Sequence, residues 1–258
     1  MTEGNKTASE VLTGDAAGGY GTATLYEASG LECACQPGLR PVWPGARVAG
    51  LAYTVAGLGG DNLALHRAVA HAPFGHVLVA DLQGAVHGHW GEVLTVAAQQ
   101  RGLPGLVIDG GVRDVAELAA LGFPVMASSV AVFHTGKDHP GRPAQPIVLR
   151  GVPVSTGDLI VADTDGVVIL PAAEAAAIIH RADQRLHHEQ QVIAGLRGGR
   201  TTLQLYGFSI AKHRTTQERR GEHRGNEAPT PPARPVSPGP ALQSILKRPW
   251  GRGCPSRA

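Results

Sequence analysis

The stretch VIDGGVRDVAELAALGFPVMASS, residues 107–129, decides the fold. A short apolar run leads into a Gly-Gly turn, a helical pattern opens at Arg113-Asp114, and Gly122 closes it before a second apolar run. Glycine just past the last helical residue is a common helix stop, and short apolar runs bounded by glycine are typical of buried strands. The stretch therefore predicts a strand, a helix and a second strand in close succession.

The same order is found upstream. HVLVADL (76–82) has the pattern of a buried strand, and WGEVLTVAAQQRG (90–102) that of a helix ending at a glycine. Before them, VAGLAYTVAGL (48–58) is strand-like and precedes a helix capped by Asp61 or Asn62. Strands that alternate with helices in this way predict an α/β fold with a parallel sheet.

The downstream part is richer in strands. Residues 146–171 are mostly strand-like with glycine-containing turn signals, and an amphipathic helix is expected from about 172 to 196. These patterns predict one α/β domain, a layered sandwich of β-sheets and helices, over residues 11–211. A flexible lead-in at residues 1–10 precedes it.

The charge of the chain is unevenly distributed. The formal net charge is +2, yet residues 212–258 alone carry ten lysines and arginines against three glutamates, together with eight prolines. This composition predicts a basic, disordered tail, which is a solvated extension, an assembly artefact or a binding segment. The body at 11–211 is then acidic, so its charge gives no argument for nucleic-acid binding.

The cysteine content and the hydropathy of the chain indicate which cellular compartment to expect. The three cysteines include Cys33 and Cys35, one residue apart, and form no disulfide framework. The N-terminal residues contain no apolar leader, and no apolar run reaches the roughly 18–20 residues that span a bilayer. We expect a reduced, cytoplasmic protein without membrane contact.

Two predicted helix starts carry groups that suit an anionic ligand. GEVL, residues 91–94, offers free N–H groups at a helix N-terminus, which bind carboxylates well. Arg113 offers a bidentate fork for a carboxylate, and Asp114 offers a hard oxygen for Mg²⁺ or Mn²⁺. Because both helices follow consecutive strands, we expect their starts to lie side by side. The alternative is that Asp114 only caps its helix and Arg113 pairs with a surface acid.

Four segments resemble a known family. GDNLALHRAV (60–69), WGEVLTVAAQQRGLPGLVIDGGVRDVAEL (90–118), GFPVMAS (122–128) and GDLIVADTDGVVILP (157–171) are similar to the RraA-like family. They resemble in particular its 4-hydroxy-4-methyl-2-oxoglutarate / 4-carboxy-4-hydroxy-2-oxoadipate aldolases. The resemblance extends over about residues 24–207 and includes none of the tail.

The resemblance implies a pyruvate site. The carboxylate would be bound by the backbone of Gly91, Glu92, Val93 and Leu94. Arg113 would contact the keto and carboxyl oxygens and stabilise the enolate, while Asp114 would be the direct protein ligand of Mg²⁺ or Mn²⁺. A water positioned by Glu92 or by more distant acids would remove the 4-hydroxyl proton. A Schiff base on Lys137 is the rival aldolase chemistry.

The resemblance also implies supporting residues. Glu27 and Glu189 match outer-sphere acids, at least one of them from a neighbouring subunit, and His66 and Lys137 match supporting polar positions. Each has a simpler interpretation as a solvated, packing or capping residue. A glycine, Gly136, stands where these aldolases carry a β-branched residue, which predicts a looser loop around Lys137.

The implied function is cleavage of a 4-hydroxy-2-oxo acid to pyruvate and a second oxo acid, with oxaloacetate decarboxylation as a side activity. The implied assembly is a homotrimer or a dimer of trimers. The alternative function is that of RraA itself, a regulator that binds an RNA-degrading endonuclease without catalysis. His87 and His89 form an HGH element, but further ligands for a zinc site are missing from the pattern.

Overall fold

The computed structural model describes residues 17–208. The lead-in expected at 1–10 and the tail expected at 212–258 lie outside these residues. In chain order the elements are α3 (Thr22–Ser29), β1 (Arg40–Pro41), β2 (Val48–Ala56), α4 (Leu63–His71), β3 (Val77–Trp90), α5 (Glu92–Gln100), β4 (Leu106–Val112), α6 (Val115–Ala120), β5 (Val125–Val130), β6 (Arg142–Pro143), β7 (Ile147–Leu149), β8 (Val152–Val154), β9 (Leu159–Ala162), β10 (Val167–Leu170), α7 (Ala175–Arg197) and α8 (Thr202–Leu205).

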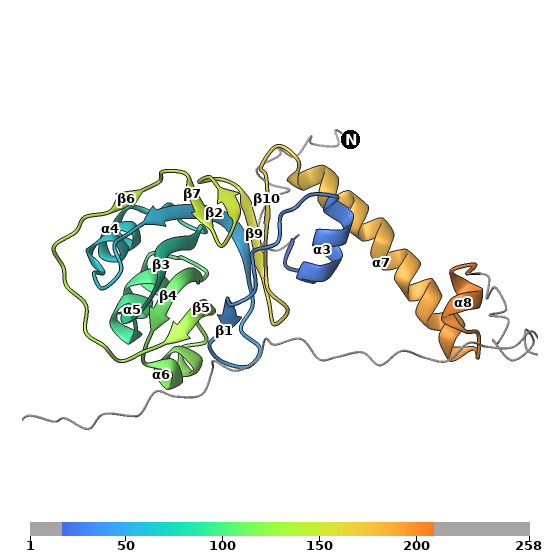
Figure 1. Cartoon of the computed structure of the whole chain (residues 1–258), viewed down its shortest axis with the longest axis horizontal. Coiled ribbons are helices and arrows are strands. Elements are labelled where there is room, and N and C mark those ends of the chain that lie inside the picture. Colours follow the sequence, from blue (N-terminus) through green and yellow to red (C-terminus); the bar gives the residue numbers. More distant parts are fainter. Residues whose placement is uncertain (1–16, 209–258) are drawn as a thin grey trace, which may run out of the picture. The chain divides into compact units, whose positions relative to one another are not determined.

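A large mixed sheet organises these elements. Its strand order is β1-β5-β4-β3-β2-β9-β10, and β6 also pairs with β2. The four strands β2 to β5 run parallel to their neighbours, while β9 and β10 are antiparallel. The predicted α/β fold with a parallel sheet is confirmed. The parallel strands bring the ends of β2, β3 and β4, and the turns that follow them, to one edge of the sheet (Figure 1).

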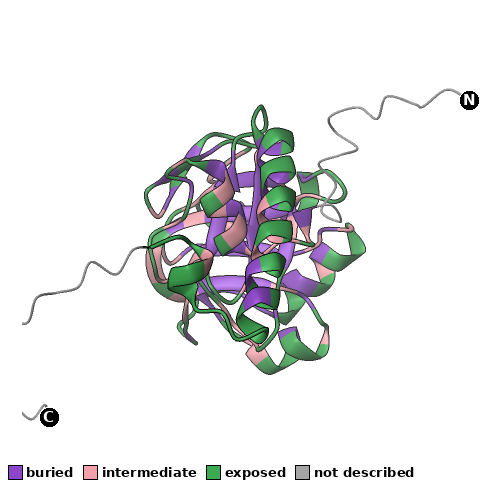
Figure 2. Ribbon diagram, turned by 90° about the vertical axis from the view of Figure 1, so that its right-hand side faces the viewer, coloured by how far each residue is buried: buried purple, intermediate pink, exposed green. Residues whose placement is uncertain are grey.

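Three apolar cores hold the layers together. The helices α4, α5 and α6 pack on one face of the parallel strands, where Leu65, Leu78 and Ile108 are among the buried side chains. The β7–β8 hairpin covers the other face. The third core joins α3 and α7 to β9 and β10 (Figures 1 and 2). Within the described residues, no helix is both long and apolar enough to cross a membrane.

The course of β3 differs from the prediction. The sequence predicted an end at residue 82, but the strand continues to Trp90 through two register shifts against β4. Gln83 takes a left-handed conformation with φ of 58° within this irregular part. The extension aligns Trp90 with Val112 of β4, so that the turns after these two strands start side by side.

Candidate functional site

A backbone hydrogen bond joins the turn after β3 to the turn after β4. The Arg113 N–H donates to the Trp90 carbonyl over 2.8 Å. Trp90 is fully buried, and its Nε1 donates to Thr95 Oγ1 of α5 over 2.7 Å. The start of α5 and the start of α6 are therefore fixed to the same strand ends, as the sequence predicted.

Asp114 is held in a conformation that aims its carboxylate away from its own helix. It occupies the N-cap position of α6 with φ of 56° and ψ of 42°, but its side chain accepts no capping hydrogen bond. Instead Oδ2 accepts the N–H of Glu92 at 3.0 Å and lies 3.6 Å from Arg113 Nε. A left-handed residue other than glycine costs about 1–3 kcal/mol and is often found at functional sites. Asp114 therefore does not cap its own helix, and its carboxylate instead binds the first N–H of α5.

Two glycines make room for these side chains. A Cβ at Gly91 would overlap Asp114 Oδ2. A Cβ at Gly88 would lie 2.9 Å from both Arg113 Cδ and the Ala131 carbonyl oxygen. Any side chain at these positions would therefore displace the acid, the guanidinium or the backbone.

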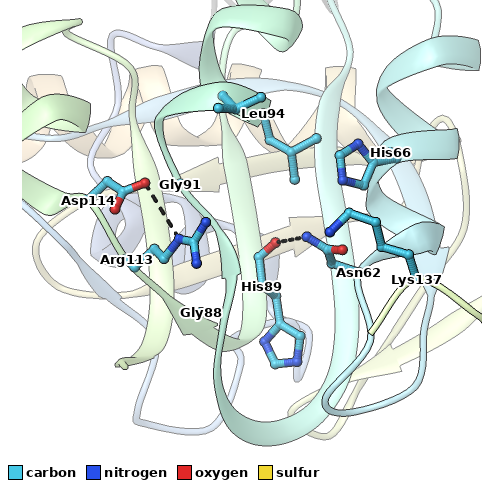
Figure 3. Close-up of a pocket in the computed structure, with 10 residues that line it drawn as sticks. Asn62, His66, Gly88, His89, Gly91, Leu94, Arg113, Asp114 and Lys137 are labelled. Carbon is cyan, nitrogen blue, oxygen red and sulfur yellow. Dashed lines mark hydrogen bonds and ion pairs between the residues drawn. The ribbon is translucent and has the colours of Figure 1, made fainter. Parts of the chain in front are cut away.

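A pocket of about 200 Å³ opens beside this turn. Its lining residues are Asn62, His66, Gly88, His89, Gly91, Val93, Leu94, Arg113, Asp114 and Lys137. Figure 3 shows Arg113 and Asp114 on one wall and Asn62, His66 and Lys137 on the other. The side chains of Arg113 and Asp114 are 48% and 36% exposed, so both are accessible to a small ligand.

The wall formed by α4 and the loop after β5 carries a neutral histidine and a lysine. Burial lowers the pKa of His66, and the nearby charge of Lys137 lowers this pKa further. His66 is therefore neutral at pH 7 and can accept a hydrogen bond. Among residues 17–208, the ammonium of Lys137 makes no ion pair. The pocket thus offers two cationic side chains, Arg113 and Lys137, on facing walls.

His89 is a structural part of the pocket. Its Nε2 accepts the N–H of Gly60 at 2.9 Å, which leaves the proton on Nδ1 to be donated to the Gly111 carbonyl at 3.1 Å. Burial lowers the pKa of His89, so the ring stays neutral. With both nitrogens engaged, His89 is not free to ligate zinc. In the described part of the chain, no group of three or more His, Cys, Asp or Glu residues is placed to hold a metal.

The predicted carboxylate site at the start of α5 is only partly free. Gly91, Val93 and Leu94 line the pocket. Glu92 gives its N–H to Asp114, and its side chain is exposed and is not among the lining residues. Of the four predicted amide groups, that of Glu92 is engaged by Asp114, while Gly91, Val93 and Leu94 remain candidates to bind an anion.

The two predicted outer-sphere acids lie elsewhere in the chain. Glu27 is on α3 and Glu189 on α7, and neither lines the pocket. Arg185 of α7 joins them: its Nη2 pairs with Glu27, and its Nε lies 3.1 Å from Glu189 Oε1. The structure thus brings these acids to each other but not to Asp114.

Sequence reasoning missed the pocket roles of Asn62, Gly88 and His89. Asn62 was predicted as a helix cap, yet it makes no side-chain cap and its Nδ2 donates to the His89 carbonyl at 3.0 Å. The signal was present in the GDN and HGH segments. The partners of these residues are backbone groups distant in sequence, so the motifs alone could not assign the contacts.

Comparison with known proteins identifies the family. The sequence profile described as RraA-like, Aldolase/RraA, matches residues 22–169. The chain belongs to the RraA-like family. This match includes both helix starts and the strands of the parallel sheet. It confirms the resemblance that the motifs indicated.

Relatives within the RraA-like family carry two kinds of name. A protein of Halalkalibacterium halodurans, "Putative 4-hydroxy-4-methyl-2-oxoglutarate aldolase", is 33% identical over 57% of this chain and 70% of its own length. A Deinococcus radiodurans protein of the same name is 31% identical over 58% of this chain and 94% of its own length. The structure of the RNA-processing inhibitor RraA from Thermus thermophilis has a TM-score of 0.55 at 27% identity, covering 59% of this chain and 93% of that one.

A further structure gives a higher TM-score. It is that of an uncharacterized protein from Pseudomonas syringae, with a TM-score of 0.70 and 28% identity. The match covers 77% of this chain and 93% of that chain. The RraA-like fold thus extends over most of the described residues.

Proposed function

We infer that this chain is a divalent-metal-dependent aldolase that cleaves 4-hydroxy-2-oxo acids to pyruvate and a second oxo acid. The observation that carries this proposal is Asp114, whose carboxylate is turned from its own helix toward the start of α5 and lies beside Arg113. The names of the relatives from Halalkalibacterium halodurans and Deinococcus radiodurans support the same reaction class.

The residues fit a loosely held Mg²⁺ or Mn²⁺. Asp114 supplies an accessible carboxylate, and within residues 17–208 no second carboxylate is among the lining residues. Mg²⁺ typically retains several waters and binds through one or two carboxylates plus the substrate. Asp114 would hold such an ion, with water and the 2-oxo acid as its other ligands. When bound, the ion would polarise the keto group and stabilise developing negative charge.

The protein's own groups would orient the substrate and balance its charge. The amides of Val93 and Leu94 would bind the pyruvyl carboxylate at the positive end of α5. Arg113 would donate to the keto oxygen as the carbon–carbon bond breaks. Lys137, on the facing wall, would pair with the second acid group. A water would accept the 4-hydroxyl proton, because the Glu92 side chain does not line the pocket.

The same enolate chemistry would make oxaloacetate decarboxylation a side activity. Lys137 is in a position to face the substrate as well, so a Schiff base is the competing route. The two routes differ in their need for a metal and in their response to borohydride.

Pyruvate release tests this function directly. Purified protein would be assayed with a panel of 4-hydroxy-2-oxo acids, with Mg²⁺, with Mn²⁺ and with excess EDTA. We expect turnover with metal, its loss in EDTA, and its return when Mg²⁺ is added back. Turnover that persists in EDTA and is stopped by borohydride would favour the Schiff base. No turnover of any substrate would favour the non-catalytic regulator, like the Thermus thermophilis protein.

A site shared between subunits is the second part of the proposal. Glu27 and Glu189 lie on α3 and α7, away from the lining residues, so they would act only in a neighbouring copy. Val130, Val132 and Phe133, in the segment that runs past the pocket, are 59%, 82% and 63% exposed. A partner that covered them would bury apolar surface. The proposed assembly is a homotrimer or a dimer of trimers.

Subunit mixing tests the shared site. Asp114→Ala and Glu189→Ala damage different halves, so we expect activity to return in part when the two inactive proteins exchange subunits. Asp114→Ala mixed with Arg113→Ala is the matched control, since both variants damage the same half and no intact site can form. Three outcomes would contradict the proposal. They are recovery of activity in the control mixture, no recovery in the first mixture although subunits have exchanged, and a fully active monomer.

A further inference from the structure

Asp61 is a buried carboxylate that joins two segments distant in sequence. It is 4% exposed. Its Oδ1 accepts the N–H of Leu63, the first residue of α4, at 2.9 Å. Its Oδ2 accepts the N–H of Asp138 at 2.7 Å. One oxygen is therefore bound to the helix that carries His66, and the other to the loop that carries Lys137.

Backbone hydrogen bonds reinforce the same junction. The Gly136 N–H donates to the Gly60 carbonyl at 2.8 Å, and the Asn62 N–H donates to the Gly136 carbonyl at 3.1 Å. Gly60 in turn donates to His89, the buried histidine of the pocket. Lys137 is thus flanked on both sides by residues tied to the segment before α4.

Gly136 does not loosen this loop, contrary to the expectation from the sequence. A Cβ at Gly136 would lie 2.9 Å from Asp61 Oδ2, closer than real Cβ contacts allow. The missing side chain permits the loop to approach the carboxylate. The glycine and the acid are therefore matched parts of one junction.

The charge of Asp61 suits this arrangement. Burial on its own would raise the pKa of the carboxyl group, but the N–H groups of Asp138, Leu63 and His139 outweigh that effect and lower the pKa. The group is therefore ionised at neutral pH. An ionised carboxylate accepts two strong hydrogen bonds at once, whereas an asparagine in its place would present one acceptor and one donor.

We propose that Asp61 is a positioning residue, which fixes the loop at 136–138 so that the Lys137 ammonium faces the second acid group of the substrate. Figure 3 shows Lys137 extending beside Asn62 and His66 toward the pocket. The role in substrate binding rests on the proposed aldolase function. The role in holding Lys137 does not, and it has its own measurement.

The first measurement is the backbone hydrogen exchange of the loop that carries Lys137. Exchange of the Asp138 amide, which donates to Asp61 Oδ2, would be followed by mass spectrometry of a peptide spanning residues 136–138 in the full chain. We expect Asp61→Asn to raise the exchange rate by about tenfold, because one charge-assisted hydrogen bond to the loop is lost. Gly136→Ala approaches the same contact from the loop side and should raise it too. An unchanged rate in both folded variants would overturn the proposal.

Asp163 offers a matched control. It is likewise a carboxylate that accepts backbone N–H groups, those of Thr22 at 2.9 Å and Asp165 at 2.9 Å, and its pKa is also lowered although burial opposes this. It does not line the pocket. Asp163→Asn should therefore leave the exchange rate at residues 136–138 unchanged. An increase equal to that of Asp61→Asn would mean that general destabilisation, rather than loss of the Asp61 contact, frees the loop.

The second measurement is a double-mutant cycle on turnover. Asp61→Asn and Lys137→Met should each raise KM by about tenfold with a smaller change in kcat, and the double variant should lose no more than either one. Additive losses would overturn a role through Lys137. If the parent protein turns over no substrate, the proposed function fails, but the hydrogen-exchange rates still test whether Asp61 holds the loop.

Discussion

Asp114→Asn is expected to lower kcat/KM by about 10³-fold or more while the protein remains folded. The substitution removes the single carboxylate available to a divalent ion, and such charge stabilisation contributes several kcal/mol to catalysis. Asparagine tolerates the left-handed conformation that Asp114 adopts at φ of 56°, so the backbone should be retained. Pyruvate release, measured at several Mg²⁺ concentrations, checks the loss of activity. Thermal unfolding checks that the variant remains folded.

Two further variants separate the charge of Asp114 from its strained backbone. Asp114→Gly removes the acid and relieves the left-handed conformation, so we expect an inactive protein whose unfolding temperature changes little, because relief of the backbone offsets the lost hydrogen bond to the Glu92 N–H. Glu117→Gln removes an exposed acid in the first turn of the same helix and should leave activity within a few-fold of the parent. An Asp114→Asn protein that retains metal-dependent turnover within tenfold of the parent would refute its role as the metal ligand.

Arg113→Lys is expected to lower kcat/KM by about 10²-fold. The guanidinium presents a planar fork that can donate to two oxygens of a 2-oxo acid, and an ammonium on a flexible stem does not reproduce this geometry. Gly88 leaves space for the Arg113 stem, and Asp114 Oδ2 lies 3.6 Å from Nε, so the side chain is held in place before substrate binds. Comparing kcat and KM for Arg113→Lys and Arg113→Met checks whether the loss occurs in the transition state.

The control for Arg113 is a conservative change at an arginine outside the pocket. Arg101 lies at the other end of α5 and is exposed, so Arg101→Lys should be silent. A lysine at position 113 that retains activity within a few-fold of the parent would show that positive charge suffices and that bidentate geometry is not needed.

The parallel sheet was predictable because its signals are local. The strands before α5 and α6 are short apolar runs, and glycines stand just past the helices, as Gly102 and Gly122 do with positive φ. The extension of β3 to Trp90 could not be predicted, because its irregular part contains glycines and histidines rather than a strand pattern. That irregular part determines how the β3 turn meets the β4 turn.

The candidate site was predictable in part for the same reason. Arg113 and Gly91 come directly after buried strands, so their proximity followed from the order of the elements. The contribution of Asn62 and the tie between Asp61 and the Lys137 loop depend on a loop that returns from residue 136 to residue 61. No local pattern encodes such a return.

Gly88 and Gly91 limit which side chains this part of the pocket can accept. At these two positions a single added methyl group would displace Arg113 or Asp114. On the other wall His66 and Lys137 line the pocket with their side chains, and neither is held by a glycine contact of this kind. The two glycines thus limit steric change close to Arg113 and Asp114, and a change of ligand would more readily be accommodated by the other lining side chains.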